Sequence, residues 1–479
     1  MSFLNNDVII EQRRYVLSAR DKCSGLIVPG AFVRGIRHLG YRTNVEAIAE
    51  LVDNSIQAYA ENINVVFGFD ADGSSRKPTK LAIIDDGHGM DPTMMRFAMM
   101  WGGTHRENNR DGLGRFGYGL PCAAVSIGRK FTIYSLPVGG RLHRVTLDLG
   151  SMGKGSNDAD LEMVIPDAKP ARLPRFVTDA LKEAQPRGWQ SGTVVIIENI
   201  DRLDWTTVVG LRRNLVRRFG VAYHKLLRST SIHVDGEEVR PIDPLFLDPD
   251  ADLFDLDGDR ALALDPVTVL MDGDDGRVGE VTLRYAWLPP SFAATDKTRD
   301  AIGINANDRF PIIKQFHGIN FTRNGRLIDV QARTPWTVFI NNDRYIRVEI
   351  EFSAALDEAF GVTTSKQQVS VSAHMWDRLR VAGLNKAIEH LRAKVRTAKG
   401  ERPAHEPRAV IGHAEKPSRA GIAHLTGVPP GVAVSDGLSI LLEVIERRAS
   451  DAKPALRAEY RDLMKEWSER LLRVGAGRS

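Results

Sequence analysis

Four short segments rich in glycine, acidic or amide side chains follow one another in the N-terminal half of the chain, each beside an apolar run. They are Glu-Leu-Val-Asp-Asn-Ser-Ile-Gln-Ala (50–58), Asp-Asp-Gly-His-Gly-Met (85–90), Gly-Arg-Phe-Gly-Tyr-Gly (114–119) and Ser-Gly-Thr-Val-Val-Ile (191–196). Helical and strand-like runs are mixed around them. This mixture predicts an α+β fold, a two-layer α/β sandwich of one sheet and one layer of helices.

The helices of this first part have recognisable starts. Thr43 and Glu46 form a capping-box pattern, and apolar residues then recur at helical spacing, so we expect a helix over 43–60. Asp91-Pro92 predicts the start of another helix. A further helix is expected over 122–127. Between these helices lie β-prone runs at 63–69, 81–84, 131–135, 145–149 and 194–198.

The second part of the chain has a different pattern. After a helix predicted over 206–227, Asp-Gly and Asn-Gly pairs between β-prone runs predict hairpins, and a helix over 373–399 closes the series. We therefore expect four regions, which are an N-terminal α+β domain (1–228), a second α/β domain (229–400), a proline-rich linker (401–435) and a helical tail (436–479).

Composition limits the class of protein. The 479 residues hold two cysteines, so neither a disulfide framework nor a zinc cluster is expected. No apolar run is long enough for a transmembrane helix, and the N-terminus does not resemble a signal peptide, so we expect a cytoplasmic protein without membrane partners. The net charge of +4 permits nucleic acid as a partner.

Basic residues form two local clusters at helical spacing, each of which is either a solvated helix face or a surface that faces DNA. The clusters are Arg212, Arg213, Arg217 and Arg218, and Lys394, Arg396, Lys399 and Arg402.

Three of the four segments carry groups suited to a nucleotide. Glu50 and Asn54 lie four residues apart and project from one helix face. Asp85 ends an apolar strand and precedes glycines that permit close approach of a ligand. Glycines before the helix at 122–127 expose backbone N–H groups that bind phosphate. The glycine-rich segment has neither the Gly-Lys-Ser/Thr of a P-loop nor the βαβ context of a Rossmann fold.

Together, the four segments resemble, in order and spacing, the ATP-site motifs of the GHKL superfamily, which includes gyrase B subunits, MutL, MORC proteins, heat-shock chaperones and histidine kinases. The resemblance implies a Bergerat-type ATP-binding domain followed by a transducer-like domain similar to ribosomal protein S5. It also implies hydrolysis of ATP to ADP and phosphate with Mg²⁺.

The resemblance assigns roles to single residues. It implies that Glu50 is the general base and that Asn54 is the Mg²⁺ ligand, while Asp53 only supports the site. It implies that Asp85 binds adenine with Thr193. The glycines and methionine that shape this pocket are Gly87, Gly89 and Met90.

A lid and a distant lysine complete the implied site. The phosphate-contacting end of a lid that begins near Gly102 is formed by Gly114, Gly117, Tyr118 and Gly119. Lys366, in the Thr364–Gln368 loop of the second domain, is implied to contact the γ-phosphate.

Two functions from different classes remain after this step. The first is an ATP-gated clamp of the MORC or MutL kind that forms a homodimer on ATP binding, acts on DNA and works with an effector subunit. The second is a chaperone-like clamp that remodels a protein client. A histidine kinase is expected to carry a helix with its phosphoacceptor histidine before the ATP-binding domain. In this sequence the expected ATP-binding domain starts almost at the N-terminus, so a histidine kinase is disfavoured.

Overall fold

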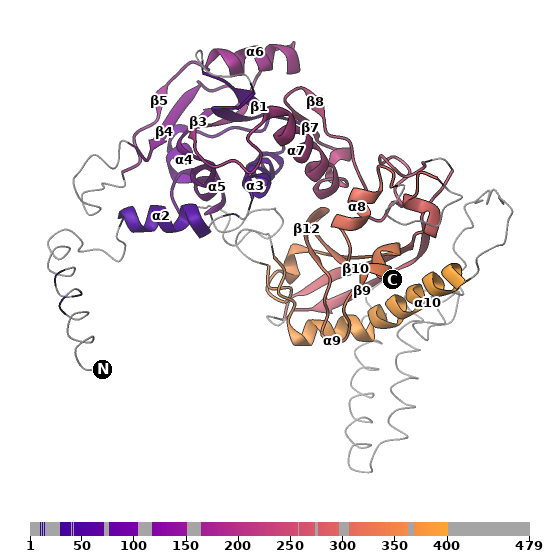
Figure 1. The fold of residues 1–479 in the computed structure, drawn as a ribbon. Helices are drawn as coiled ribbons and strands as arrows, with labels where there is room; N and C mark the ends of the chain where they lie inside the picture. Colours follow the sequence, from indigo (N-terminus) through magenta and orange to yellow (C-terminus); the bar gives the residue numbers. More distant parts are fainter. Residues whose placement is uncertain are drawn as a thin grey trace, which may run out of the picture.

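The computed structural model of the chain describes residues 10, 12, 14, 29–39, 41, 43–70, 76–103, 117–150, 164–256, 258–273, 276–296, 306–362 and 368–400. These residues form two units, each built on one β-sheet (Figure 1). The expected linker over 401–435 and helical tail over 436–479 lie outside the described residues.

The first sheet has eight strands in the order β5-β4-β3-β6-β2-β1-β7-β8. Neighbours are antiparallel except β1 and β7, which are parallel. The strands are β1 (Asn62–Gly68), β2 (Lys80–Asp85), β3 (Gly128–Leu136), β4 (His143–Asp148), β5 (Lys169–Pro170), β6 (Gly192–Ile200), β7 (Ser231–Val234) and β8 (Glu237–Glu238).

The domain boundary expected after residue 228 cuts this sheet, because β7 and β8 follow it and pair beside β1. We therefore propose that the first domain extends to residue 238.

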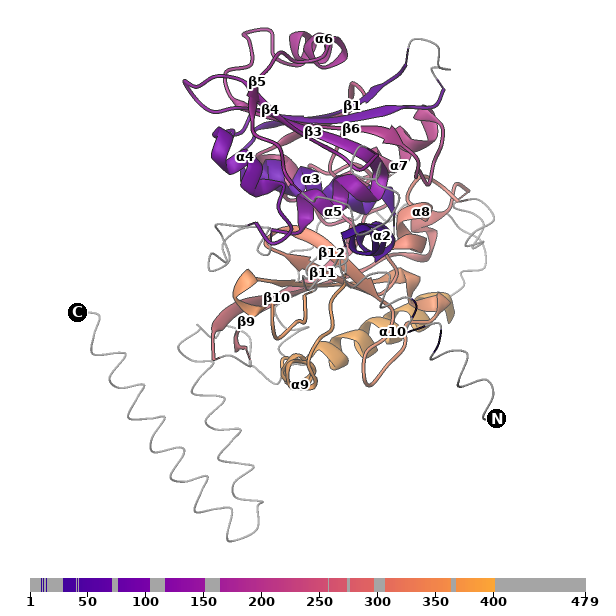
Figure 2. The ribbon, with the colours of Figure 1, turned by 90° about the vertical axis from the view of Figure 1, so that its left-hand side faces the viewer.

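Helices cover both faces of this sheet. They are α2 (Pro29–Leu39), α3 (Asn44–Gln57), α4 (Pro92–Ala98), α5 (Gly119–Ile127), α6 (Arg175–Ala184) and α7 (Val208–Ala222). The main core joins α3, α5 and α7 to one face, and a smaller core joins α6 to the other. Figure 2 shows α3 and α5 between the first sheet and the second unit. The predicted α/β sandwich is confirmed, with α6 as an addition.

The predicted helix starts are confirmed by their caps. The Thr43 hydroxyl accepts a hydrogen bond from the Glu46 N–H at 3.3 Å, and it thereby satisfies a donor of the first turn of α3. Asp91 caps α4 by accepting hydrogen bonds from the N–H groups of Thr93 and Met94.

The second sheet has five strands in the order β12-β11-β13-β10-β9. They are β9 (Leu262–Asp272), β10 (Val278–Trp287), β11 (Ile319–Arg323), β12 (Arg326–Gln331) and β13 (Ile346–Phe352). Its helices are α8 (Phe310–Gln315), α9 (Ala373–Val381) and α10 (Leu384–Gly400). The single helix expected over 373–399 is wrong, because Gly383 has a φ of +97° and divides it into α9 and α10.

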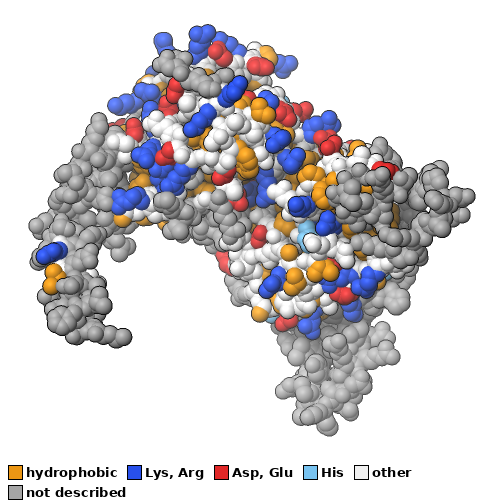
Figure 3. Space-filling model, viewed as in Figure 1, with side chains coloured by type: hydrophobic (Ala, Val, Ile, Leu, Met, Phe, Trp, Pro, Cys, Tyr) orange, Lys and Arg blue, Asp and Glu red, His pale blue; other side chains and the backbone are white. Residues whose placement is uncertain are grey.

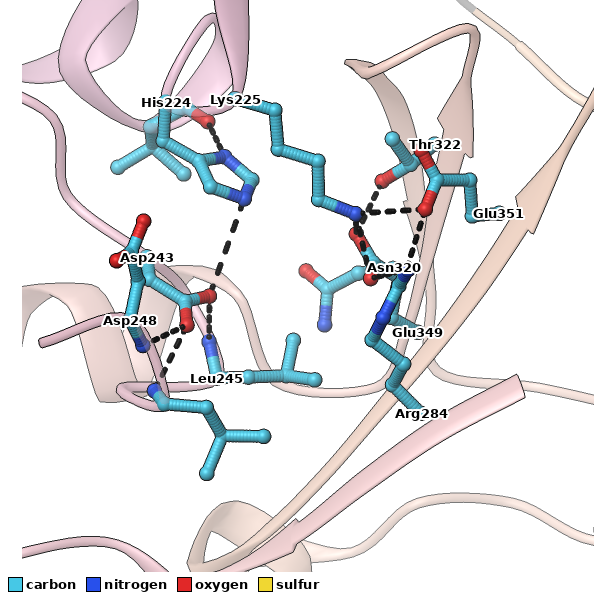
Figure 4. A network of polar contacts seen from close by, with 12 residues as sticks. His224, Lys225, Asp243, Leu245, Asp248, Arg284, Asn320, Thr322, Glu349 and Glu351 are labelled. Atoms are coloured by element: carbon cyan, nitrogen blue, oxygen red, sulfur yellow. Dashed lines mark hydrogen bonds and ion pairs between the residues drawn. The ribbon is translucent and has the colours of Figure 1, made fainter. Parts of the chain in front are cut away.

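A polar network joins the two units (Figure 4). Lys225, which follows α7, lies 2.8 Å from the Glu349 carboxylate of β13 and 2.9 Å from that of Glu351. Arg284 of β10 donates to Glu349 at 2.9 Å.

No helix among the described residues is long and apolar enough to cross a membrane.

Candidate active site

The first part of the candidate site is built on α3. Glu50 is 3% exposed, and its carboxylate lies against the first residue of α5. A Cβ atom added to Gly119 would lie 2.1 Å from Glu50 Oε1, so only glycine leaves room for this carboxylate. Asn54 lies one turn further along the helix and is half-buried. The predicted pairing of Glu50 with Asn54 on one helix is therefore present, beside the start of α5.

The backbone at the start of α5 is suited to an anion. Tyr118 precedes the helix and makes no side-chain capping hydrogen bond. The first N–H groups of a helix lack partners within the helix, and its dipole favours negative charge there. Gly119 and Tyr118 therefore lie where a phosphate group can be bound.

The two ends of the expected lid meet beside this helix. The Gly102 N–H donates to the Gly117 carbonyl at 3.1 Å. Gly117 has a φ of +70°, and a Cβ on it would lie 2.6 Å from the Gly103 backbone. Residues 104–116 between these ends, which include Gly114, lie outside the described residues.

Asp85 forms the opposite end of the site, where β2 ends. Its Oδ1 accepts hydrogen bonds from the N–H groups of Gly87 (3.0 Å) and Thr193 (2.9 Å), and its Oδ2 accepts from the Ser55 hydroxyl (2.8 Å). Burial raises the pKa of the Asp85 carboxyl, although these three hydrogen bonds act in the opposite direction. A carboxylate has about four acceptor positions, so one remains for a ligand.

Asp86 binds backbone groups of its own domain and, unlike Asp85, is not assigned to a ligand. Its carboxylate accepts hydrogen bonds from the backbone N–H groups of Glu61 and Asn62, both at 2.9 Å. The following loop packs on the end of α3, where a Cβ on Gly87 would lie 2.6 Å from the Ala58 carbonyl oxygen. Gly89 has a φ of +69° and lies against the Leu136 backbone. Asp86 and these glycines fix the turn that presents Asp85.

Three further residues support Asp85 and were not singled out from the sequence for this role. Ser55 donates to the carboxylate directly. The Ser135 hydroxyl accepts from the Met90 N–H at 2.8 Å and lies 2.9 Å from the Thr193 hydroxyl. The Trp189 indole N–H donates to the Asp85 carbonyl at 2.8 Å. Ser55 follows Asn54 in the first motif, but no sequence pattern connects Ser135 or Trp189 with Asp85.

The Glu50 charge acts on two neighbouring titratable side chains, Tyr41 and Cys122. Burial, and then the Glu50 charge, raise the pKa of Tyr41 well above its ordinary value. Burial raises the pKa of the Cys122 thiol to about 11, with a further contribution from Glu50, against a hydrogen bond from Trp101. Both side chains therefore stay protonated near neutral pH.

The donor set fits magnesium bound together with a nucleotide. Within the described ranges, no three His, Cys, Asp or Glu side chains are grouped closely enough to hold a metal ion. Mg²⁺ keeps several waters and takes few protein oxygens, with phosphates supplying the rest. The Asn54 amide oxygen beside a phosphate-binding helix end meets this requirement. Lys366 lies outside the described residues.

Comparisons with known proteins agree with this geometry. Residues 41–176 match the family described as histidine kinase-, DNA gyrase B-, and HSP90-like ATPases. The chain is also similar to Protein MICRORCHIDIA 6 of Arabidopsis thaliana, with 30% identity over 89 residues, which is 19% of this chain. The matched segment spans 13% of that relative. The match covers α3, Asp85 and the start of α5, so the segment that carries the candidate site is similar to the ATPase domains of this family.

Proposed function

We propose that this chain hydrolyses ATP with Mg²⁺ at the site between Asp85 and Glu50. One observation carries the proposal. The buried Glu50 carboxylate lies against the first residue of α5, a helix start suited to phosphate, while the buried Asp85 keeps an acceptor position for a base. Adenine and phosphate therefore have binding groups within a single domain. The match of residues 41–176 to the ATPase family supports the same conclusion.

Asp85 selects adenine by charge and by hydrogen-bond direction. An ionised carboxylate only accepts hydrogen bonds, and the adenine amino group only donates them. Gly87, Thr193 and Ser55 hold Asp85 in place and occupy three of its acceptor positions. The Asp85 carboxylate therefore favours adenine over guanine, which has a carbonyl oxygen at the corresponding ring position.

Glu50 activates the attacking water. Its carboxylate accepts the water proton as the oxygen attacks the γ-phosphorus. The N–H groups at the start of α5 bind the phosphates and offset their charge, and Asn54 provides an oxygen for Mg²⁺. Bound Mg²⁺ supplies electrostatic stabilisation of the transferring phosphoryl group.

The second unit couples ATP hydrolysis to closure of the two units. We propose that Lys366, which lies between β13 and α9 in the sequence, contacts the γ-phosphate when ATP is bound. ADP lacks the γ-phosphate, so only ATP favours the closed arrangement. Closure then promotes homodimerisation of the ATP-binding domains.

We propose DNA as the partner of this clamp. Fewer basic side chains support this proposal than the two clusters in the sequence contain. Arg212 pairs with Glu237, and Arg218 lies over the Phe316 ring. The face in Figure 3 has Lys and Arg side chains spread over both units with Asp and Glu between them. Among the side chains that the structure describes, the exposed members of the two clusters are Arg213, Arg217, Lys394 and Arg396.

Size analysis with and without a non-hydrolysable ATP analogue tests the clamp, and repetition with duplex DNA tests its partner. We expect a dimer with the analogue and DNA binding that falls steeply with salt, as phosphate contacts require. A dimer without DNA binding at low salt favours the chaperone-like clamp. Monomers under all conditions, with nucleotide bound, contradict the clamp itself.

A further inference from the structure

A buried arginine of the second unit reaches the helix that carries Glu50. Arg326 is the first residue of β12, and its Nε lies 2.7 Å from Oδ1 of Asp53 on α3. The Asp53 side chain is 0% exposed and that of Arg326 is 8% exposed. Asp53 lies three residues after Glu50, within one helical turn. A charge from the second sheet therefore contacts the catalytic helix directly.

The hairpin between β11 and β12 aims Arg326 at α3. Asn324 and Gly325 form its turn with φ values of +47° and +80°, as expected for an Asn-Gly hairpin. A Cβ on Gly325 would lie 3.3 Å from the Leu226 side chain, so the turn packs against the end of the first unit. Arg326 follows this turn immediately, and its position is therefore fixed by the contact between the units.

Tyr223 holds Asp53 from a second direction. Its hydroxyl lies 2.9 Å from Asp53 Oδ1 and 2.9 Å from the Ala49 carbonyl oxygen, and the two acceptors share its single proton. The Arg326 guanidinium carbon lies 5.6 Å from the centre of the Tyr223 ring. Because Ala49 directly precedes Glu50, this cluster fixes the backbone of α3 beside the catalytic carboxylate.

Charge explains why an arginine is needed here. Asp53 and Glu50 are two buried carboxylates on one helix, and such neighbours repel each other. Burial lowers the pKa of Arg326, but Asp53, Tyr223 and Glu50 outweigh it, so its pKa lies above the usual range. Removal of the guanidinium leaves a buried carboxylate without its compensating charge.

The contact between the units does not depend on Arg326 alone. The network of Lys225, Glu349 and Arg284 in Figure 4 joins them at a separate place and includes no residue of α3. Arg326 therefore adds contact with the catalytic helix to an interface that is already held.

We propose that Arg326 is a positioning residue that, through Asp53, holds Glu50 in the place needed for hydrolysis. ATP turnover thus depends on how the second unit sits on α3. This inference rests on the proposed ATPase function and extends it, since it makes the second unit a regulator of the general base as well as the source of Lys366.

Three substitutions test the inference. Arg326→Met removes the charge and keeps most of the side-chain volume. We expect kcat to fall by roughly 10- to 100-fold with KM for ATP little changed, because displacement of a catalytic group by about 1 Å has such an effect. Arg326→Lys restores most of kcat, since its ammonium group replaces the charge. A kcat of Arg326→Met equal to that of the wild type overturns the proposal.

Arg323→Met is the matched control. Arg323 ends β11, on the other side of the same turn, and its Nε lies 2.6 Å from Asp357 Oδ1 in a buried pair within the second unit. This variant also leaves a buried carboxylate uncompensated, so it loses stability in a similar way. We expect it to retain the kcat of the wild type. An equal loss of kcat in both variants reduces Arg326 to a stabilising residue.

The double variant Arg326→Met/Asp53→Asn separates position from stability. It removes the Asp53 charge together with the Arg326 charge, so we expect its melting temperature to return towards that of the wild type while kcat stays low. Recovery of kcat together with stability overturns the proposal, and this comparison remains available if Arg326→Met alone does not fold.

Hydrogen exchange distinguishes this inference from the ATPase function. In the absence of nucleotide, we expect faster amide exchange over α3 in Arg326→Met than in Arg323→Met. If the wild type releases no phosphate but this difference is present, the proposed function fails and the contact of Arg326 with α3 stands. If the wild type hydrolyses ATP and the difference is absent, only the role of Arg326 fails.

Discussion

The Glu50 carboxylate and Gly119 touch so closely that a Cβ atom at position 119 would lie 2.1 Å from Glu50 Oε1. In the proposed function, this contact joins the helix that activates water to the helix that binds phosphate. Gly119 is the first residue of α5 and has an ordinary helical backbone, which any residue can adopt. Glycine is needed there only because a side chain would collide with the Glu50 carboxylate.

Gly119→Ala is expected to displace Glu50 and to lower kcat sharply. The added methyl group cannot fit beside the carboxylate, and overpacking of this kind destabilises a protein by about 1–3 kcal/mol. Phosphate release and thermal unfolding measure the two effects. Gly35→Ala in α2 is the control, since nothing lies within 4 Å of its added Cβ, and it should leave kcat unchanged. Wild-type turnover in Gly119→Ala contradicts the assigned geometry.

Asp85→Asn is expected to weaken ATP binding by about tenfold or more, which corresponds to about 1.4 kcal/mol. An amide in place of the carboxylate loses a charged acceptor and brings a donor among three donors. Calorimetric titration with ATP measures the change. Asp86→Asn is the neighbouring control, because Asp86 accepts from Glu61 and Asn62. It should lower the melting temperature and affect ATP affinity less, and equal losses of affinity refute the assignment of Asp85 to adenine.

The pKa of Glu349 makes the junction between the units sensitive to acid. Burial raises the pKa of Glu349. The Lys225 charge and the hydrogen bond from Thr322 lower this pKa by more than burial raises it, so it lies below its ordinary value. The folded state therefore keeps the charge where the unfolded state binds a proton. The stability that this charge contributes is fully present above the ordinary pKa of about 4.3 and is lost as pH falls through the lower, folded pKa.

Glu349→Gln should consequently reduce the free energy of unfolding by about 3 kcal/mol at pH 7, and the difference from the wild type should shrink below pH 4. Denaturant unfolding at several pH values measures this. Glu351→Gln is the control, because Glu351 shares Lys225 and Arg284 but its side chain is 23% exposed. A deficit for Glu349→Gln that stays constant with pH speaks against this linkage.

Cys122 is expected to resist alkylation. Its pKa of about 11 leaves little thiolate at pH 8, so in a Cys23→Ser background it should react about 10²-fold more slowly than a free thiol. Because the folded thiol keeps a proton that the unfolded thiol loses, this group lowers stability as pH rises above about 8.5. Mass spectrometry after timed exposure to iodoacetamide measures the rate. Fast labelling at pH 8 would contradict the raised pKa of the thiol.

Local features of the sequence predicted local structure. Thr43 and Asp91 cap helices where their patterns indicated, because a cap depends on residues two or three positions away. The sequence order Glu50, Asn54 and Asp85 places these groups in one site, and their roles there stay predictions. Gly383 shows the limit of periodicity, since the apolar pattern continues across a residue whose backbone ends the helix.

Features that depend on distant residues were not predicted. Asp53 was expected only to support the site, and its pairing with Arg326 depends on how a hairpin of the second sheet packs on α3. The same holds for Arg212 and Arg218, which form a basic cluster in the sequence but contact Glu237 and Phe316 in the structure. Side chains from separate elements meet through tertiary packing, which a one-dimensional pattern does not contain.

Steady-state phosphate release by the wild type and by Glu50→Ala, with ATP affinity measured in parallel, tests the central claim most directly. We expect the wild type to hydrolyse ATP and to require Mg²⁺ for this reaction. We expect Glu50→Ala to bind ATP normally and to turn over about 10²–10⁴-fold more slowly, because the general base is lost and the binding groups remain. Near-normal phosphate release by Glu50→Ala, or failure of the wild type to bind ATP, contradicts the central claim.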